Sequence, residues 1–152
     1  MTPRTDNPPA ASLKLDAQLC FALYSATHLV TRAYRPLLEP LGLTYPQYLA
    51  MLALWEQDDV TVGQLGERLF LDSGTLTPLL KRLQQAGLID RQRASDDERQ
   101  VRITLTDRGR EAKREARSIP SALLKASGCS LEELRGLVQS LHRVRETLAQ
   151  AG

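Results

Sequence analysis

The stretch from Thr61 to Thr106 constrains the fold of this 152-residue chain more than any other, because it holds two short amphipathic helices and two strand-like runs. Thr61 followed by Gln64 has the spacing of a helix capping box, and apolar residues over 62–70 recur on one helical face. The following LDSGT segment predicts a break and a second helix start, since its polar residues favour N-cap positions. The second helix ends at Gly87 and has four leucines on its buried side: Leu76, Leu79, Leu80 and Leu83. Two short helices joined by a tight turn predict a helix-turn-helix, whose second helix can enter the major groove of DNA.

Two strand-like runs, LIDRQR and QVRITL, follow the second helix and flank the polar segment ASDDER, which suits the tip of a hairpin. A hairpin after a helix-turn-helix predicts a winged helix, so the fold class is mainly α with a small β-hairpin wing. From Leu79 to Gly109 the ordered pattern resembles the MarR family of winged-helix transcriptional regulators. Six residues carry the match to its D-x-R wing element and its closing LTxxG: Asp97, Glu98, Arg99, Leu105, Thr106 and Gly109.

The segments before the winged helix are predicted to be an arm and two helices. Residues 1–12 contain three prolines and few apolar side chains, which is typical of a flexible N-terminal arm. A long helix is predicted over 13–38, with apolar residues around most of its circumference, so it needs apolar neighbours on several sides. Thr44 is the predicted cap of a helix over about 46–56, in which Trp55 is expected in the core.

The segments after the winged helix are predicted to be helical. Thr106 caps a polar helix interrupted at Pro120, and Ser130 with Glu133 forms a capping box for the last helix, which has a heptad-like apolar stripe. Terminal amphipathic helices beside an apolar first helix predict a homodimer. Residues 13–152 are therefore expected to form a single MarR-like domain. Its dimerisation helices are expected over 13–45 and 107–152, and its DNA-binding winged helix-turn-helix over 46–106.

Bulk charge and composition exclude several classes of protein. The net charge is only +2, and Lys81 to Arg102 holds six basic against four acidic residues, so DNA binding must depend on where the charges lie. No apolar run is long enough to cross a membrane and no secretion signal is evident, which predicts a cytoplasmic protein without a permanent disulfide. His28 and His142 are isolated, so no metal site is expected. Without a phosphate-binding loop or a catalytic triad, neither a cofactor nor an enzyme is predicted.

The candidate DNA contacts lie on the exposed side of the second helix and on the wing. The helix candidates are Ser73, Thr75, Thr77, Lys81, Arg82 and Gln85. Thr75 and Thr77 suit bases and Lys81 and Arg82 suit phosphates, although any solvated helix face carries such residues. Arg99 at the wing tip could enter the minor groove, or pair with Asp97, which would support the hairpin.

Cys20 lies among apolar residues in the first predicted helix, with Tyr24 one turn further along. Tyr34 is 14 residues from Cys20, roughly 20 Å along a straight helix, so the two could meet only across a two-fold axis. Together with Tyr45 this spacing resembles the organic-hydroperoxide-sensing branch of the MarR family. The resemblance implies that Cys20 is the peroxidatic thiol and that Tyr34 and Tyr45 of the partner subunit hydrogen-bond it. Tyr24 is a third candidate for a hydrogen bond to the thiol. A lone cysteine in an apolar helix is otherwise most often a small core residue, and each tyrosine alone most often a packing residue.

Cys129 directly precedes Ser130, where the free N–H groups of a helix start favour a thiolate. In two-cysteine members of that branch a cysteine in this region resolves the sulfenic acid as a disulfide between subunits, which implies the resolving role for Cys129; the alternative is an inert loop thiol. The interpretation is a homodimeric repressor that leaves a pseudo-palindromic operator when an organic hydroperoxide oxidises Cys20. The alternatives are a repressor released by a non-covalent aromatic ligand, a thiol peroxidase, and a purely structural dimerisation module.

Overall fold

The computed structural model describes residues 13–97 and 99–152, so the predicted N-terminal arm lies outside the described residues. The chain divides into two compact units, one ending at Ala33 and one beginning at Tyr34. The first unit contains the short 3-10 helix η1 (Leu15–Ala17) and most of α1 (Leu19–Leu38). The other helices are η2 (Glu39–Leu41), α2 (Tyr45–Glu56), α3 (Val62–Leu69), α4 (Ser73–Gln85), α5 (Asp107–Ala116), α6 (Ile119–Ser127) and α7 (Leu131–Ala151). The strands are β1 (Val60–Thr61), β2 (Ile89–Arg93) and β3 (Val101–Leu105).

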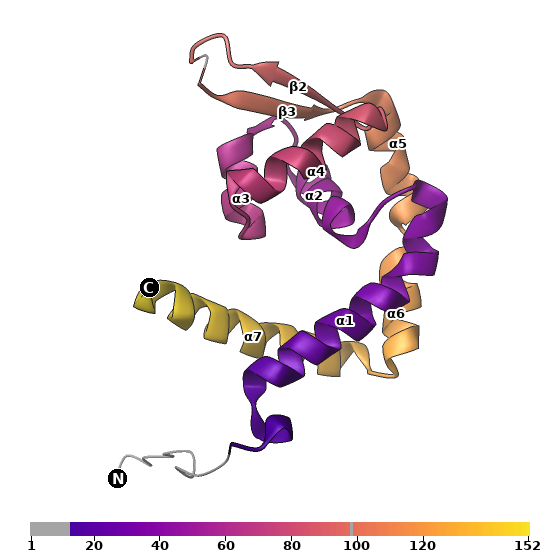
Figure 1. Ribbon diagram of the computed structural model, residues 1–152. Helices are drawn as coiled ribbons and strands as arrows, with labels where there is room; N and C mark the ends of the chain where they lie inside the picture. Colours follow the sequence, from indigo (N-terminus) through magenta and orange to yellow (C-terminus); the bar gives the residue numbers. More distant parts are fainter. Residues whose placement is uncertain (1–12, 98) are drawn as a thin grey trace. The chain divides into compact units, whose positions relative to one another are not determined.

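The second unit is a winged helix, which confirms the predicted fold class. Strands β2 and β3 pair antiparallel, with Ile89 opposite Leu105 and Arg93 opposite Val101, and they form the hairpin that projects beyond the helices in Figure 1. β1 pairs with the other edge of β3, so the sheet order is β1-β3-β2. The third strand was not predicted, because two residues are too few to show an alternating pattern.

Side-chain caps fix the helix starts that the sequence predicted. Complete capping boxes begin α2, α3 and α7, formed by Thr44 with Gln47, Thr61 with Gln64, and Ser130 with Glu133. The side chains of Asp72 and Thr106 cap α4 and α5. The backbone hydrogen bond from Thr75 lowers the pKa of Asp72, so this cap stays ionised at neutral pH.

Two predicted helices are interrupted at places that the sequence did not indicate. The prediction of a long helix over 13–38 is wrong at its start. Gln18 adopts an extended conformation after η1, and α1 begins only at Leu19. The polar helix after the wing is interrupted at Arg117 and Ser118 rather than at Pro120. Pro120 instead lies in the first turn of α6, where the missing N–H of proline costs no helical hydrogen bond.

The core of the second unit lies between α2, α3, α4 and the sheet. The side chains of Leu54, Leu76, Leu80 and Ile103 are completely buried there, and all four leucines predicted on the inner side of α4 are buried. The outer side of α4 is left free by this packing. Trp55, which was expected in the core, is partly buried and packs against its edge.

Candidate functional site

Cys20 lies in the first turn of α1, within the first unit, and its side chain is exposed in the single chain. Its position near a helix start follows from the break at Gln18, which moves it away from the helix interior that the sequence predicted. Tyr24 follows one turn later, and its ring makes an edge-on contact with His28, with ring centroids 4.5 Å apart. The apolar neighbours Phe21 and Leu23 are only partly covered.

Cys129 lies in the short link between α6 and α7 and is partly buried. Its backbone N–H donates to Ser127 Oγ at 3.1 Å, and its thiol contacts the Ser127 carbonyl oxygen at 3.8 Å. Both cysteines are free thiols. Cys129 is therefore held immediately before the capping box that begins α7.

Three tyrosines form a cluster within the second unit. The ring of Tyr34, from α1, lies 4.7 Å from that of Tyr45 and 5.6 Å from that of Tyr48, measured between centroids. Burial raises the pKa of Tyr34 to about 12, and Tyr45 and Tyr48 contribute to the same shift. Burial also raises the pKa values of Tyr45 and Tyr48. All three hydroxyls therefore keep their protons at neutral pH and can donate hydrogen bonds.

Tyr48 was missed by the sequence reasoning, although it lies on the same face of α2 as Tyr45, three residues further on. That spacing was the available signal. The structure brings Tyr34, Tyr45 and Tyr48 together. Cys20 and Tyr24 belong to the other unit, so the hydrogen bonds expected from the tyrosines to Cys20 stay a prediction.

The outer side of α4 carries the predicted DNA contacts. Ser73, Thr75, Lys81, Arg82 and Gln85 are exposed, and Thr77 is partly buried. The turn into this helix passes through Phe70, which adopts a left-handed conformation with φ of 57° although it is not glycine. Asp72 then accepts from the backbone N–H of Thr75 at 2.7 Å, which fixes the first turn of α4.

The wing tip is held by the backbone contacts of Asp97. Its carboxylate accepts from the backbone N–H of Arg99 at 3.0 Å, and its carbonyl oxygen accepts from the N–H of Gln100 at 3.0 Å. Among the described residues, no ion pair joins the Arg99 guanidinium to Asp97. The Arg99 side chain is exposed at the tip.

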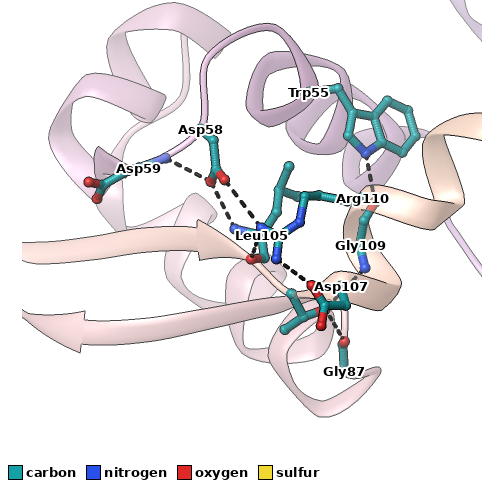
Figure 2. Close-up of polar contacts among 9 residues, drawn as sticks. Trp55, Asp58, Asp59, Gly87, Leu105, Asp107, Gly109 and Arg110 are labelled. Atoms are coloured by element: carbon teal, nitrogen blue, oxygen red, sulfur yellow. Dashed lines mark hydrogen bonds and ion pairs between the residues drawn. The ribbon is translucent and has the colours of Figure 1, made fainter.

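The base of the wing is tied to α2 and α5 by Asp58, as Figure 2 shows. Its carboxylate accepts from the backbone N–H groups of Asp59 at 2.7 Å and Leu105 at 2.9 Å. Arg110 lies 3.7 Å from the same carboxylate and donates to the carbonyl oxygen of Leu105 at 3.0 Å. These contacts join the end of α2, the end of β3 and the start of α5.

A second set of contacts holds the start of α5. The indole N–H of Trp55 donates to the carbonyl oxygen of Gly109 at 2.8 Å (Figure 2). The Thr106 hydroxyl donates to the Gly87 carbonyl oxygen at 2.6 Å and accepts from the N–H of Gly109 at 3.0 Å. A Cβ at position 109 would lie 2.1 Å from the carbonyl oxygen of Leu88, so only glycine fits there. The sequence reasoning had used Gly109 only as part of a motif.

Over residues 13–97 and 99–152, no group of three or more histidine, cysteine, aspartate or glutamate side chains is arranged to hold a metal ion. In the same part of the chain, no helix is both long enough and apolar enough to span a membrane.

Comparison with known proteins places the chain among transcriptional regulators. The family model of the SarA/Rot transcriptional regulators matches residues 32–116. The organic hydroperoxide resistance transcriptional regulator of Bacillus subtilis (strain 168) is 51% identical over 138 residues, which cover 91% of this chain and 94% of that relative.

Solved structures of the AbfR protein of Staphylococcus epidermidis have a similar fold. Overoxidised AbfR bound to DNA is 38% identical, with a TM-score of 0.72, and the match covers 88% of this chain and 94% of AbfR. A disulfide-containing form of AbfR is 40% identical, with a TM-score of 0.60, and the match covers 86% and 91% of the two chains.

Proposed function

This chain belongs to the MarR family of winged-helix transcriptional regulators, in its organic-hydroperoxide-sensing branch, and we propose that it represses transcription until such a peroxide oxidises Cys20. The observation that carries this proposal is the set of Cys20, Tyr34 and Tyr45 in a chain 51% identical to an organic hydroperoxide resistance regulator. Reduced protein binds a pseudo-palindromic operator, and oxidised protein leaves it.

The winged helix supplies the DNA-binding surface. Its outer α4 face carries Thr75 and Lys81 in the exposed positions from which a recognition helix contacts bases and phosphates. Asp97 holds the hairpin turn through backbone hydrogen bonds, which leaves the Arg99 guanidinium free to enter a minor groove. Because Lys81 and Arg82 of α4 suit phosphate contacts, the affinity for DNA is expected to fall as the salt concentration rises.

The sensing surface requires two copies of the chain. Large apolar side chains on α1 and α7 are exposed in a single chain, including Leu29 at 62%, Leu137 at 54% and Leu148 at 68%. Exposed apolar side chains of this kind mark an interaction site, and a second copy of the chain covers them in the homodimer. Tyr34 and Tyr45 of the partner subunit then donate hydrogen bonds to the Cys20 thiolate.

The oxidation takes place in two steps. The Cys20 thiolate attacks the terminal oxygen of the hydroperoxide and the O–O bond breaks, so Cys20 keeps the OH group as a sulfenic acid, and the departing alkoxide takes a proton from solvent and leaves as the alcohol. The thiol of Cys129 of the partner subunit then attacks the Cys20 sulfur, and water leaves as the disulfide forms. Each protein molecule reacts once and must then be reduced before it can react again, so it acts as a sensor and not as an enzyme. We place this reaction in the cytoplasm, where the operator lies.

Replacing Cys20 with serine tests the proposal. Because Cys20 is the group that the peroxide attacks, Cys20→Ser should bind the operator like the natural protein and keep it after hydroperoxide treatment, as measured by fluorescence anisotropy with labelled operator. Ala22→Ser is the matched control, since it places a hydroxyl on the exposed part of the same helix and should still release DNA. Release of DNA by oxidised Cys20→Ser protein would show that another group senses the peroxide.

A groove of about 400 Å³ favours a second candidate function, in which a small aromatic ligand releases the repressor. The groove is mainly apolar and lies between α2 and the α5–α6 segment, with Leu52 and Trp55 on one side and Ala116 and Pro120 on the other. Titration of phenolic compounds into the Cys20→Ser protein on labelled operator separates the two candidates. Release by a phenol without oxidation would favour the ligand mechanism.

A further inference from the structure

Tyr48 takes no part in the proposed oxidation of Cys20. It is nevertheless the most buried tyrosine of the cluster of Tyr34, Tyr45 and Tyr48, with 2% of its surface exposed. It lies on α2 three residues after Tyr45, so both rings leave the same face of the helix. The capping box of Thr44 and Gln47 fixes the start of this helix, and Gln47 is itself buried. The backbone that carries Tyr45 and Tyr48 is therefore well defined.

The ring of Tyr48 contacts two other rings. Its centroid is 5.6 Å from that of Tyr34, with an angle of 45° between the planes. It is 6.3 Å from the ring of Trp55, which it meets nearly edge-on at 68°. Both distances are within the range in which aromatic rings attract one another in preferred orientations. Tyr48 thus connects Tyr34 to Trp55.

Trp55 is a fixed support for Tyr48. Its indole N–H donates to the Gly109 carbonyl oxygen at 2.8 Å (Figure 2), and the backbone at Gly109 lies directly against the carbonyl oxygen of Leu88. The indole therefore cannot turn without breaking a hydrogen bond to α5. A tyrosine ring that rests on such a support can in turn restrict the other ring that it contacts.

Tyr34 needs such a restriction. Tyr34 is only half buried. Besides Tyr48, its ring contacts that of Tyr45, which is also partly exposed. Among the described residues, neither hydroxyl has a hydrogen-bond partner within the chain that would hold its ring in place. The direction of both hydroxyls consequently depends on ring packing, and Tyr48 is the buried member of that packing.

We propose that Tyr48 is a positioning residue for peroxide sensing: it holds the ring of Tyr34, and through it that of Tyr45, in the orientation in which their hydroxyls donate to the thiolate of Cys20. This inference rests on the proposed function. It assigns the effect to the ring of Tyr48 and not to its hydroxyl. Loss of the ring leaves Tyr34 free to turn, which weakens the hydrogen bonds to the thiolate and makes Cys20 less reactive.

The test uses full-length protein in a Cys129→Ser background, so that Cys20 is the only thiol. Tyr48→Leu removes the ring, Tyr48→Phe keeps it, and Leu54→Ala is the matched control, because Leu54 is buried on another side of the same helix. Two rates are measured for each protein. The first is the rate of Cys20 alkylation by iodoacetamide as a function of pH, and the second is the rate of Cys20 oxidation by cumene hydroperoxide at neutral pH. Thermal unfolding and operator affinity of the reduced proteins report on the fold.

With Tyr48→Leu we expect alkylation that requires a higher pH by roughly one unit, and slower oxidation at neutral pH, because weaker hydrogen bonds leave a smaller fraction of Cys20 as thiolate. Tyr48→Phe should restore both rates, and Leu54→Ala should lower the unfolding temperature without moving the alkylation profile. Identical profiles for Tyr48→Leu and the natural residue, or equal shifts in Tyr48→Leu and Leu54→Ala, would overturn the positioning role. Failure of the proposed function would give a different result from failure of the positioning role, because Cys20→Ser protein would then still release DNA after peroxide treatment.

Discussion

Single residues in the tyrosine cluster are adapted to donate hydrogen bonds. A phenol can stabilise a thiolate only while it carries its proton, and burial keeps the protons on Tyr34, Tyr45 and Tyr48 far above neutral pH. The hydroxyl of Tyr34 has the largest of these shifts, to a pKa of about 12. The cluster therefore remains a set of donors at every pH at which the protein would meet a peroxide.

The raised pKa of Tyr34 predicts how stability changes at high pH. Between the ordinary value of 10.0 and about 12 the unfolded chain loses this proton and the folded chain keeps it, so the free energy of unfolding falls as pH rises through that window. Below it both states keep the proton, and the contribution is constant. Tyr34→Phe should make the fall shallower in chemical unfolding measured at a series of alkaline pH values. If the free energy of unfolding fell equally steeply in the variant, groups other than Tyr34 would cause the fall.

Glycines at two element ends show how close the backbone segments approach. Gly87 follows α4 in a left-handed conformation, with φ of 77° and open space around the position of a Cβ. Gly109 lies in α5 against the backbone of Leu88, with no space for a Cβ. The first glycine is required by conformation and the second by contact between α5 and the start of β2.

These two causes predict different costs for the same substitution. Gly87→Ala should lower the free energy of unfolding by about 1 kcal/mol, the cost of a left-handed residue with a Cβ. Gly109→Ala should lower it by about 3 kcal/mol or more, because neither backbone segment can move without breaking the Trp55 and Thr106 hydrogen bonds. Urea unfolding of both variants measures the difference. Equal costs would contradict the tight contact at Gly109.

Elements with local signals were predictable from the sequence, and elements fixed by distant contacts were not. Capping boxes such as Thr61 with Gln64 lie within four residues, so the starts of α3 and α7 could be read directly. The break at Gln18 has no proline or glycine, and β1 exists only because Val60 pairs with Ile103. The link from Asp58 to Leu105 and Arg110 spans about fifty residues, and nothing in the local pattern indicates it.

The residues of the candidate site stay a prediction, and the structure bears on part of its geometry. Cys20, Tyr34 and Tyr45 were named from a spacing that resembles the peroxide-sensing branch, and the structure brings Tyr34 and Tyr45 together. Tyr48 was missed because a tyrosine in an amphipathic helix usually serves as packing. In the proposed function Cys20 approaches the tyrosines between subunits. The apolar stripes of the terminal helices indicate a dimer, but they do not show which side chains meet across its interface.

The whole molecule is expected to depend on dimerisation, since α7 has no buried residue in the single chain. Leu137 lies on its apolar stripe, and Leu137→Asp would place a charge in the subunit interface. This variant should be a monomer by light scattering and lose most of its operator affinity, because one subunit contacts only a half-site. Gln139→Asp adds the same charge to an exposed position two residues away and should remain a dimer. A dimeric Leu137→Asp protein would place the interface elsewhere.

Peroxide-dependent release of DNA is the central claim, and a gel shift on the chain's own upstream DNA tests it most directly. Reduced protein is compared with protein treated with one equivalent of cumene hydroperoxide, and each sample is also run on a non-reducing denaturing gel. We expect a shift that the peroxide abolishes and a covalently linked dimer band. A thiol reductant should restore the shift and remove the dimer band. A shift that persists in fully oxidised protein would contradict it.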